Sequence, residues 1–372
     1  MRILVEGLPT KAGTSLAVII EHLLQAWVTL DGSDELHLVQ TPAAGIAVPA
    51  DVTVHEVEVG RSHALTRVRA QTLLVPLLCR RLRATAMLGV MPATSLAPLP
   101  CPRAVIAYDF RHERLPEQFS RSVRIQRKLS YGLALRQVDG VACISKRTRT
   151  DLLAPRSWLA EREIRVAYLG SDHVASWRAE PTDEPYAVAF GQFGNKNADM
   201  VIDAWGILRD KDEGMRLKLI GMPEEAREAA GERVRRLGLE ELVELEGWLF
   251  GDDLRRCFAS AALFVFPSNF EGFGLPPVEA MRLGIPVVIT PEPALLEVTG
   301  GHATVMSDWT PAALADGVVQ AGKKTAQELA AARRRAEEFS WPRMAREVRS
   351  MLEAITAKHG QGRSPKSAAI VS

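Results

Sequence analysis

The 372-residue sequence has few cysteines, few aromatic residues and no long apolar run, and each shortage argues against a class of protein. Its four cysteines include no Cys-x-x-Cys pair, so their spacing suits neither a disulfide framework nor a zinc site. Aromatic residues make up 6% of the chain, which argues against a surface that stacks nucleic-acid bases. No run of about 18 apolar residues is present, so no transmembrane helix is expected. Residues 1–6 form a short apolar segment unlike a signal peptide, and we therefore expect a cytoplasmic protein with reduced thiols.

Positive and negative charges nearly cancel over the whole chain, whose net charge is +1. The two halves differ, because residues 1–180 hold 23 basic and 17 acidic residues whereas the remainder holds 23 and 28. A basic N-terminal half would suit an acidic acceptor or an anionic membrane face, although chance also produces an asymmetry of this size.

Short apolar segments alternate with longer helical patterns, and the whole pattern runs twice. Such alternation predicts βαβ units with parallel sheets. In the first run, strands are predicted at residues 3–5, 37–39, 52–57, 87–90, 104–107, 141–144 and 164–167, and helices at 14–30, 64–82 and 123–135. In the second run, strands are predicted at 186–190, 217–220, 243–245, 263–266 and 287–290, and helices at 198–208, 224–237, 252–259, 277–283, 312–339 and 343–357.

The repetition predicts an α/β protein made of two Rossmann-like domains. Their boundaries follow from the polar segment 171–184, which has the composition of a linker. The predicted parts are a first domain at residues 1–172, a second at 180–340, a final helix at 341–358 and a disordered tail at 360–372. Ligands of parallel sheets bind beyond the carboxyl ends of the strands, so the loops there are the places to look for chemistry.

The most informative stretch is residues 266–279, Phe-Pro-Ser-Asn-Phe-Glu-Gly-Phe-Gly-Leu-Pro-Pro-Val-Glu. A predicted strand ends there in a loop with two glycines, Gly272 and Gly274, and a helix is expected to begin near Pro276, since proline is tolerated in a first helical turn. Free N–H groups and the helix dipole at such a start bind a diphosphate, and Gly274 leaves room for its oxygens.

Glu271 and Glu279 bracket this helix start. A carboxylate accepts hydrogen bonds from vicinal hydroxyls, so one carboxylate can hold a hexose and the other a ribose, with the diphosphate between them. The stretch therefore predicts a site for a nucleotide sugar. The alternative, a helix start with incidental glutamates, is disfavoured by the strand, glycines and prolines in this order.

At these residues the chain resembles the family-four retaining glycosyltransferases, which have the two-domain GT-B fold and a Glu-x7-Glu signature. The signature stands here as Glu271-Gly-Phe-Gly-Leu-Pro-Pro-Val-Glu279, and the Gly-Ile-Pro-Val-Val segment at residues 284–288 also resembles the family. The resemblance covers nearly all of residues 160–345 and is looser in the N-terminal half. It implies two Rossmann-like domains that face each other across a cleft, with a C-terminal helix that crosses back to the N-terminal domain.

The resemblance also implies roles for residues of the second domain. Glu271 would bind sugar hydroxyls, Glu279 the ribose, and Lys196 the donor diphosphate as a mobile point charge. Gln192 stands where many relatives carry an arginine, and a solvated helix-start lysine is the alternative for Lys196. Further donor contacts are expected from Gly191, Phe273, Gly274 and Leu275.

The loop after the predicted strand 104–107 is the expected acceptor side. Many relatives have His-Asp there, whereas this chain has Tyr108-Asp109. Asp109 would orient or deprotonate an acceptor hydroxyl, or is a turn residue. Tyr108 is a poor base because the ordinary pKa of a phenol is about 10, so His112 is either a substitute base or an ordinary loop histidine.

Two further residues of the N-terminal half match the family less specifically. Gly13 precedes Thr14 in the first loop, which lies close to the phosphates and acceptor in relatives, and simple helix capping is the alternative. Ser145 would touch the phosphates or cap the helix that follows it.

Arg121, Arg124 and Lys128 fall on one face of the helix predicted near residues 123–135. That face is either solvated or in contact with a membrane. No His or Cys cluster has the spacing of metal ligands, so neither a metal nor a cofactor is expected.

These features predict a glycosyltransferase that moves a hexose from a nucleotide diphosphate sugar, and the resemblance implies retention of the anomeric configuration. The segment from Asp109 to Pro116 resembles mannosyl- and O-antigen-type transferases, which implies GDP-mannose as the candidate donor. The acceptor would be a saccharide, a lipid-linked molecule or a small molecule, in polysaccharide or glycoconjugate biosynthesis. We expect no nucleic-acid partner and a peripheral contact with the inner face of a membrane.

Two other functions are considered. Tyr108 and Gln192 leave open a non-catalytic subunit that binds a nucleotide sugar. A dinucleotide-dependent oxidoreductase is disfavoured, because residues 7–13 do not form Gly-x-Gly-x-x-Gly.

Overall fold

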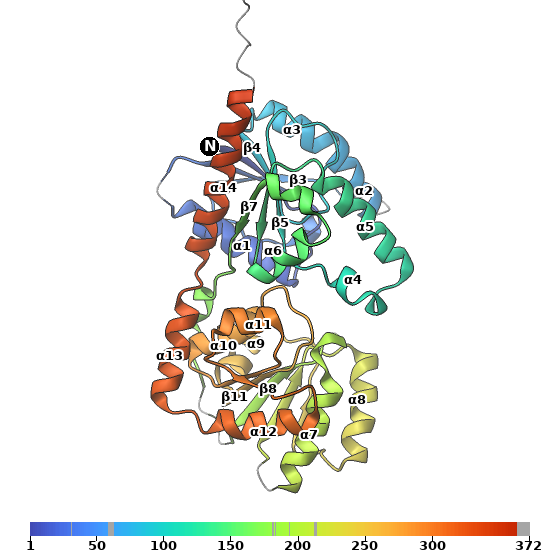
Figure 1. The fold of residues 1–372 in the computed structure, drawn as a ribbon, viewed down its shortest axis with the longest axis vertical. Helices are drawn as coiled ribbons and strands as arrows, with labels where there is room; N and C mark the ends of the chain where they lie inside the picture. The colour runs from blue at the N-terminus through green and yellow to red at the C-terminus, as the bar shows by residue number, and fades with distance from the viewer. Residues whose placement is uncertain are drawn as a thin grey trace, which may run out of the picture. The chain divides into compact units, whose positions relative to one another are not determined.

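The computed structural model describes residues 1–30, 32–58, 63–180, 182, 184–192, 194–211 and 214–362. The chain divides into two compact units, each an α/β fold with its own parallel sheet (Figure 1). Unit 1 consists of Met1–Leu169 together with the segment that starts at Trp341, and unit 2 consists of Gly170–Ser340.

Unit 1 is built on a seven-stranded parallel sheet of order β3-β2-β1-β4-β5-β6-β7. The strands are β1 (Arg2–Glu6), β2 (Glu35–Gln40), β3 (Val52–Glu56), β4 (Ala86–Gly89), β5 (Arg103–Ala107), β6 (Gly140–Cys143) and β7 (Glu163–Val166). The helices are α1 (Ser15–Val28), α2 (His63–Arg69), α3 (Val75–Arg81), α4 (Arg111–Arg114), α5 (Arg121–Leu135), α6 (Lys146–Leu153) and α14 (Trp341–Gly362). Strands β4, β5 and β6 are buried along their whole length, as expected for parallel strands covered on both faces. All seven strands predicted in this half are confirmed.

Unit 2 is built on a six-stranded parallel sheet of order β10-β9-β8-β11-β12-β13. The strands are β8 (Tyr186–Phe190), β9 (Arg216–Ile220), β10 (Val243–Leu245), β11 (Leu263–Phe266), β12 (Val287–Ile289) and β13 (Thr304–Val305). The helices are α7 (Ala198–Asp210), α8 (Glu224–Arg236), α9 (Gly251–Ala259), α10 (Leu275–Leu283), α11 (Pro293–Thr299), α12 (Pro311–Gly322) and α13 (Ala326–Glu337). The five predicted strands are confirmed, and the edge strand β13 was missed because two residues show no periodicity.

Two helices that the sequence predicts as continuous are interrupted. Residues 64–82 form α2, a π-helical segment (Ala70–Leu74) and α3, and Pro76 lies in the first turn of α3, where its missing N–H is tolerated. Residues 312–339 form α12 and α13, because Thr325 begins a new helix through a capping box with Glu328.

The structure differs from the sequence-based prediction at the expected linker and at the expected C-terminal tail. Ser171, at the start of the segment expected to be a linker, donates a hydrogen bond to the carbonyl of Ala336 at 3.0 Å within unit 2. Helix α14 extends to Gly362, past the predicted end at residue 358, and packs on α1, β6 and β7 of unit 1. Residues 363–372 of the expected tail lie outside the described residues.

The strand order of each sheet reverses at one place. The reversal lies between β1 and β4 in unit 1, and between β8 and β11 in unit 2. Open parallel sheets bind ligands outside the carboxyl ends of the strands beside such a reversal. Lys196 and Glu271 lie in the loops after β8 and β11, so unit 2 brings these two predicted site residues to its reversal.

The corresponding place in unit 1 is filled by a buried carboxyl. Glu6, the last residue of β1, is fully buried and accepts hydrogen bonds from the Thr94 hydroxyl at 2.8 Å and the Gln71 amide at 3.2 Å. Gln71 belongs to the π-helical segment, whose wider turn is a frequent feature of functional or strained positions. Burial raises the pKa of the Glu6 carboxyl to about 7.

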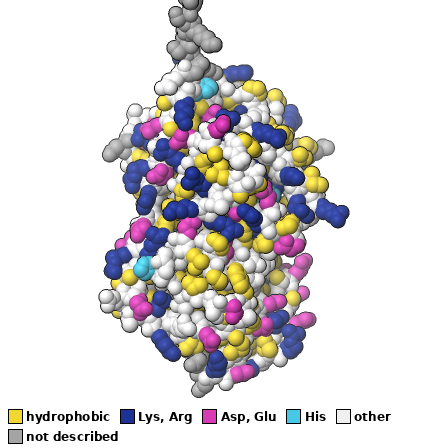
Figure 2. Space-filling view, viewed as in Figure 1, with side chains coloured by type: hydrophobic (Ala, Val, Ile, Leu, Met, Phe, Trp, Pro, Cys, Tyr) yellow, Lys and Arg dark blue, Asp and Glu magenta, His cyan; other side chains and the backbone are white. Residues whose placement is uncertain are grey.

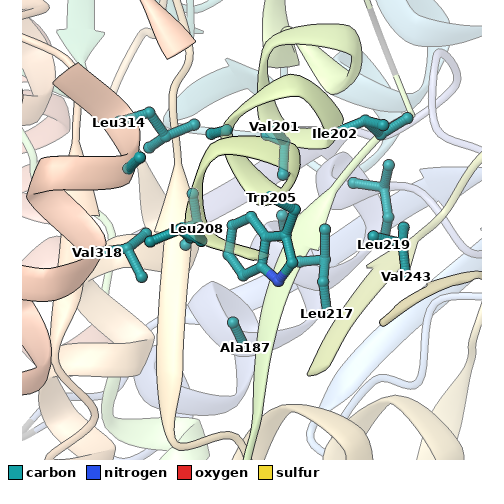
Figure 3. Close-up of a cluster of buried hydrophobic side chains, with 14 of the residues drawn as sticks. Ala187, Val201, Ile202, Trp205, Leu208, Leu217, Leu219, Val243, Leu314 and Val318 are labelled. Carbon is teal, nitrogen blue, oxygen red and sulfur yellow. The ribbon is translucent and has the colours of Figure 1, made fainter. Parts of the chain in front are cut away.

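The core of unit 2 is centred on Trp205 of α7. Its indole is fully buried among aliphatic side chains that include Val201, Leu217 and Val318 (Figure 3). The indole N–H donates to the carbonyl of Met215 at 2.6 Å, so its polar atom is satisfied.

The burial of the Trp205 indole predicts that its removal destabilises unit 2. We expect Trp205→Ala to lower the free energy of unfolding of unit 2 by about 3–5 kcal/mol, because it leaves a large cavity. Urea unfolding followed by circular dichroism measures the change. The exposed Trp248→Ala variant is the control and should unfold close to the wild type. Equal stabilities of the two variants would contradict the assigned core.

The Glu6 carboxyl generates a pH prediction. Its pKa is raised in the folded state, so folding is favoured while the carboxyl is protonated and loses this contribution as the pH rises from about 4.5 to about 7. Between pH 5 and pH 8 the loss amounts to about 2.5 kcal/mol. Between these two pH values the free energy of unfolding should therefore decrease less in Glu6→Gln than in the wild type. The exposed Glu117→Gln variant is the control, and its free energy of unfolding should decrease as much as that of the wild type. If the free energy of unfolding of Glu6→Gln decreased with pH as much as that of the wild type, this account would be refuted.

Candidate functional site

Lys196 is positioned by the turn that follows β8. The turn η6 (Gly194–Lys196) ends at this residue, and Asn197 adopts a left-handed backbone with φ of 51° at the start of α7. The Asn197 side-chain amide donates to the carbonyl of Pro267 at 2.7 Å, which ties the loop after β8 to the loop after β11. The Lys196 ammonium lies 3.9 Å from the centroid of the Phe266 ring and is shielded from solvent, so it is not the solvated lysine of the alternative interpretation.

Glu271 is fixed through one of its two carboxylate oxygens. Its Oε1 accepts from the Lys196 ammonium at 2.5 Å, the Ser268 hydroxyl at 2.5 Å and the Asn195 amide at 3.3 Å. The described residues donate no hydrogen bond to Oε2, and 16% of the side chain is exposed. A carboxylate held in this way presents its second oxygen in a fixed direction to a ligand hydroxyl.

Asn195 and Ser268 form a supporting layer that the sequence interpretation missed. The Asn195 amide also donates to the Ser268 hydroxyl at 2.9 Å and to the Phe270 carbonyl at 3.0 Å. The backbone N–H of Asn269 returns a hydrogen bond to the Asn195 carbonyl at 3.0 Å. Asn195 and Ser268 each lie near a predicted site residue, in loops that a parallel sheet brings together. Their position in the sequence could therefore have identified them as supporting residues.

Gly274 makes the turn into α10. Its φ is +91°, and a Cβ atom there would lie 2.4 Å from the Leu295 side chain, so both backbone and packing require glycine. The helix offers fewer N–H groups than expected, because Pro276 and Pro277 occupy two of its first positions. Of the four orphan N–H groups at an ordinary helix start, those of Gly274 and Leu275 remain for an anion.

Two residues expected to contact the donor are packed inside unit 2. The Phe273 side chain is buried and meets the Phe339 ring edge-on, with 5.5 Å between centroids. A Cβ atom on Gly191 would lie 2.6 Å from the Met222 side chain. The Phe273 ring is therefore buried in unit 2, and the donor contact expected from this residue stays a prediction.

Glu279, on α10, is held by a histidine that the sequence interpretation placed in the linker. The Glu279 Oε1 lies 3.0 Å from Nε2 of His173, which belongs to the turn η5 (Asp172–Ser176). Both side chains are largely shielded from solvent. No sequence pattern connects a lone histidine in a polar segment with a glutamate on a distant helix, so this pair could not have been found beforehand.

In unit 1, Asp109 and Tyr108 follow β5 with different environments. Asp109 is exposed, and its Oδ1 accepts from the backbone N–H of Arg111 at 3.0 Å, which is the turn role considered for it. The Tyr108 hydroxyl is buried and has no hydrogen-bond partner among the described residues. Burial raises the pKa of this hydroxyl above its ordinary value, so Tyr108 is unsuited to act as a base.

His112 is a buried residue of unit 1, and its role as a substitute base stays a prediction. It is buried against Tyr131, with 5.2 Å between ring centroids in an edge-on arrangement. Burial lowers the pKa of His112, which favours the neutral ring.

Gly13 and Ser145 lie beside helix starts that are capped as the alternatives anticipated. Gly13 has a φ of +72° and precedes Thr14, whose hydroxyl accepts from the Ala17 N–H at 3.4 Å. The Ser145 hydroxyl accepts from the Thr148 N–H at 2.9 Å. Capping therefore accounts for the conformation of both loops.

Neither a metal-binding cluster nor a membrane-spanning helix is present in the described ranges. No group of three or more His, Cys, Asp or Glu residues gathers there as a metal site. No helix within them combines the length and apolar character needed to cross a bilayer.

Comparison with known proteins gives a family match for the domain that carries Lys196 and Glu271. The model of the family Glycosyl transferases group 1 matches residues 184–323. Mannosylfructose-phosphate synthase of Agrobacterium fabrum is 36% identical over 103 residues, which are 26% of this chain and 23% of that protein. O-antigen chain mannosyltransferase B of Escherichia coli is 36% identical over 105 residues, 27% of this chain and 28% of that protein. The aligned segments span about a quarter of these relatives.

Solved structures extend the likeness to nearly the whole chain. The crystal structure of Anabaena Alr3699/HepE in complex with UDP superposes with a TM-score of 0.71 at 18% identity, and covers 95% of this chain and 100% of that chain. At such identity the likeness shows the fold, which is that of two Rossmann-like domains of the GT-B type. Over residues 184–323 the chain is therefore similar to the family of group 1 glycosyl transferases.

Proposed function

We propose that this protein is a retaining glycosyltransferase that transfers a hexose from a nucleotide diphosphate sugar to an acceptor hydroxyl. The observation that carries the proposal is Glu271, which is fixed by three donors through one oxygen at the reversal of the sheet. The match of residues 184–323 to glycosyl transferases supports the same reaction class.

Lys196 and the start of α10 are proposed to hold the donor diphosphate. The ammonium of Lys196 and the N–H groups of Gly274 and Leu275 supply positive charge and donors where the leaving diphosphate gains negative charge. Charge-assisted hydrogen bonds of this kind are the stronger ones, and their preorganisation lowers the barrier to departure.

The two glutamates are proposed to grip the two sugars of the donor. The available Oε2 of Glu271 would accept from hydroxyls of the hexose. Glu279, whose Oε1 is held by His173 at 3.0 Å, would accept from the ribose hydroxyls. Fixed carboxylates lose little freedom when a ligand binds, and this favours recognition.

The proposed reaction proceeds on one face of the hexose. The bond between the anomeric carbon and the phosphate oxygen breaks as the acceptor oxygen bonds to the same carbon on the same face. The departing phosphate oxygen takes the acceptor proton, so the step needs no protein nucleophile and the anomeric configuration is retained.

Asp109 is proposed as the acceptor-side group of unit 1. Its exposed carboxylate is anchored through Oδ1 by the Arg111 N–H and can accept from an acceptor hydroxyl. The acceptor is proposed to be a saccharide or a lipid-linked molecule, and a lipid-linked acceptor would bring the protein to a membrane surface.

A mannosyl donor is proposed first, with GDP-mannose as the specific candidate. Several relatives are named for mannosyl transfer, such as O-antigen chain mannosyltransferase B. A structural neighbour was solved in complex with UDP-glucose, so UDP-glucose is the comparison donor.

Substitutions at Lys196 and Glu271 test the proposed division of labour. We expect Lys196→Met to weaken binding of GDP or UDP about 10- to 100-fold, because a charge-assisted hydrogen bond is lost. Glu271→Gln should bind the nucleotide within a few-fold of wild type but lower kcat/KM of transfer about 100- to 1000-fold. Calorimetry measures binding, and product formation from GDP-mannose or UDP-glucose measures transfer.

The matched control is Glu225→Gln, at an exposed position of α8, which should leave both properties unchanged. Transfer by Glu271→Gln at the wild-type rate would refute the role of Glu271. Nucleotide binding by the wild type without transfer or hydrolysis of any tested donor would favour the non-catalytic subunit instead.

Gly274 offers a separate test of the helix start. Gly274→Ala should weaken nucleotide binding about tenfold or more, because the new Cβ meets Leu295 and displaces the N–H groups of α10. Gly284→Ala carries similar backbone strain at a φ of +79° but has no neighbour within 4 Å, so it should keep wild-type affinity. Equal affinities of both variants would remove α10 from the donor site.

A further inference from the structure

Two helical regions of unit 1 expose large apolar side chains to solvent. Their exposed apolar residues are between 44% and 66% exposed and comprise Leu65, Val68, Leu73 and Leu77 from α2, the π-helical segment and α3, and Ile125, Leu129 and Leu133 from α5. Neighbouring exposed apolar side chains of this kind, unlike single ones, mark an interaction surface. We call these residues the apolar stripes.

The stripe on α5 points away from the core of unit 1. Ile125, Leu129 and Leu133 recur every four residues, which puts them along one face of a helix. The buried residues of α5 are Tyr131, Ala134 and Leu135, which lie away from this stripe on the helix. The stripe is therefore not the rim of the core but a second apolar face.

Basic side chains accompany both stripes. Residues 63–81 and 121–135 contain eight Lys and Arg residues and no Asp or Glu. Six of the basic side chains are exposed, namely Arg69, Arg80, Arg81, Arg121, Arg124 and Lys128. None of the six has an ion-pair partner among the described residues. Exposed arginines of unit 2 differ, since Arg255 and Arg256 pair with Asp252 and Asp253.

The two regions are neighbours in unit 1. Arg67 of α2 lies close enough to the Tyr131 hydroxyl of α5 to oppose electrostatically the burial that raises its pKa to about 12. In the view of Figure 1, α2, α3 and α5 lie on the same side of unit 1. Figure 2 shows basic and hydrophobic side chains interspersed over this part of the surface.

We propose that the apolar stripes and the six exposed basic residues form a docking surface for an anionic lipid bilayer. Aliphatic side chains enter the boundary between headgroups and acyl chains, while arginine and lysine side chains meet anionic headgroups. A nucleic acid fits the charge but not the stripes, which present Leu, Ile and Val and none of the aromatic side chains on which bases stack.

The docking surface goes beyond the transfer reaction, and neither proposal depends on the other. Binding to a bilayer requires no nucleotide sugar and no acceptor. Conversely, variants of the docking surface leave Lys196, Glu271 and Gly274 untouched, so nucleotide binding by unit 2 should stay at the wild-type level. The two proposals can therefore fail separately.

Co-sedimentation of the full chain with vesicles tests the docking surface. The wild type should bind vesicles that contain phosphatidylglycerol and bind phosphatidylcholine vesicles far more weakly. Arg121→Gln/Arg124→Gln/Lys128→Gln should lower the partition coefficient on anionic vesicles about a hundredfold, at about fivefold per charge. Ile125→Ser/Leu129→Ser/Leu133→Ser should lower it about tenfold or more, because the apolar contribution is lost.

The control is Arg216→Gln/Arg255→Gln/Arg256→Gln, which removes three exposed charges of unit 2 and should bind vesicles like wild type. Circular dichroism checks that each variant is folded, as expected for exposed positions. The proposal is overturned if the wild type does not prefer anionic vesicles, or if either α5 variant binds them as the wild type does. Tighter binding to a DNA duplex than to anionic vesicles would also overturn it, in favour of a nucleic-acid surface.

Discussion

The convergence of three donors on one oxygen of Glu271 is the interaction on which the candidate site depends. It exists because parallel pairing of β8 with β11 brings the loops after both strands to the same edge of the sheet. Asn195 and Ser268 connect these loops, and Lys196 completes the arrangement with a charge that is shielded from solvent. Each donor adds to the constraint on this carboxylate, so the sheet, the turn at Asn197 and the supporting layer act together to orient it.

The carboxylates at the reversal points of the two sheets differ in burial and in hydrogen bonding. In unit 1 the Glu6 carboxyl is fully buried, and both of its oxygens accept hydrogen bonds from Gln71 or Thr94. In unit 2 Glu271 is anchored through Oε1 and remains partly exposed. A sealed carboxyl stabilises packing in its protonated form, whereas an anchored and accessible one is suited to recognise hydroxyls. The same topology therefore supports a structural role in one unit and a proposed binding role in the other.

Strand positions could be predicted from the sequence because buried parallel strands are short, continuously apolar runs between helices. The edge strand β13 and the breaks within residues 64–82 and 312–339 could not, since a proline, a π turn and a capping threonine act locally within amphipathic patterns. The motif around Glu271 located the site, but the sequence gives no burial, so the packing of Phe273 and His112 was missed. The pairing of His173 with Glu279 joins residues far apart in sequence and needs the fold to be seen.

The contact of Lys196 with Glu271 also bears on which anions the protein ignores. An ammonium that already has a carboxylate partner at 2.5 Å and an aromatic ring beneath it is a weak trap for free inorganic phosphate. A small anion would have to displace the carboxylate without offering any compensating contact. Under the proposed function, a nucleotide sugar offers many contacts at once, so the pair would favour it over free orthophosphate.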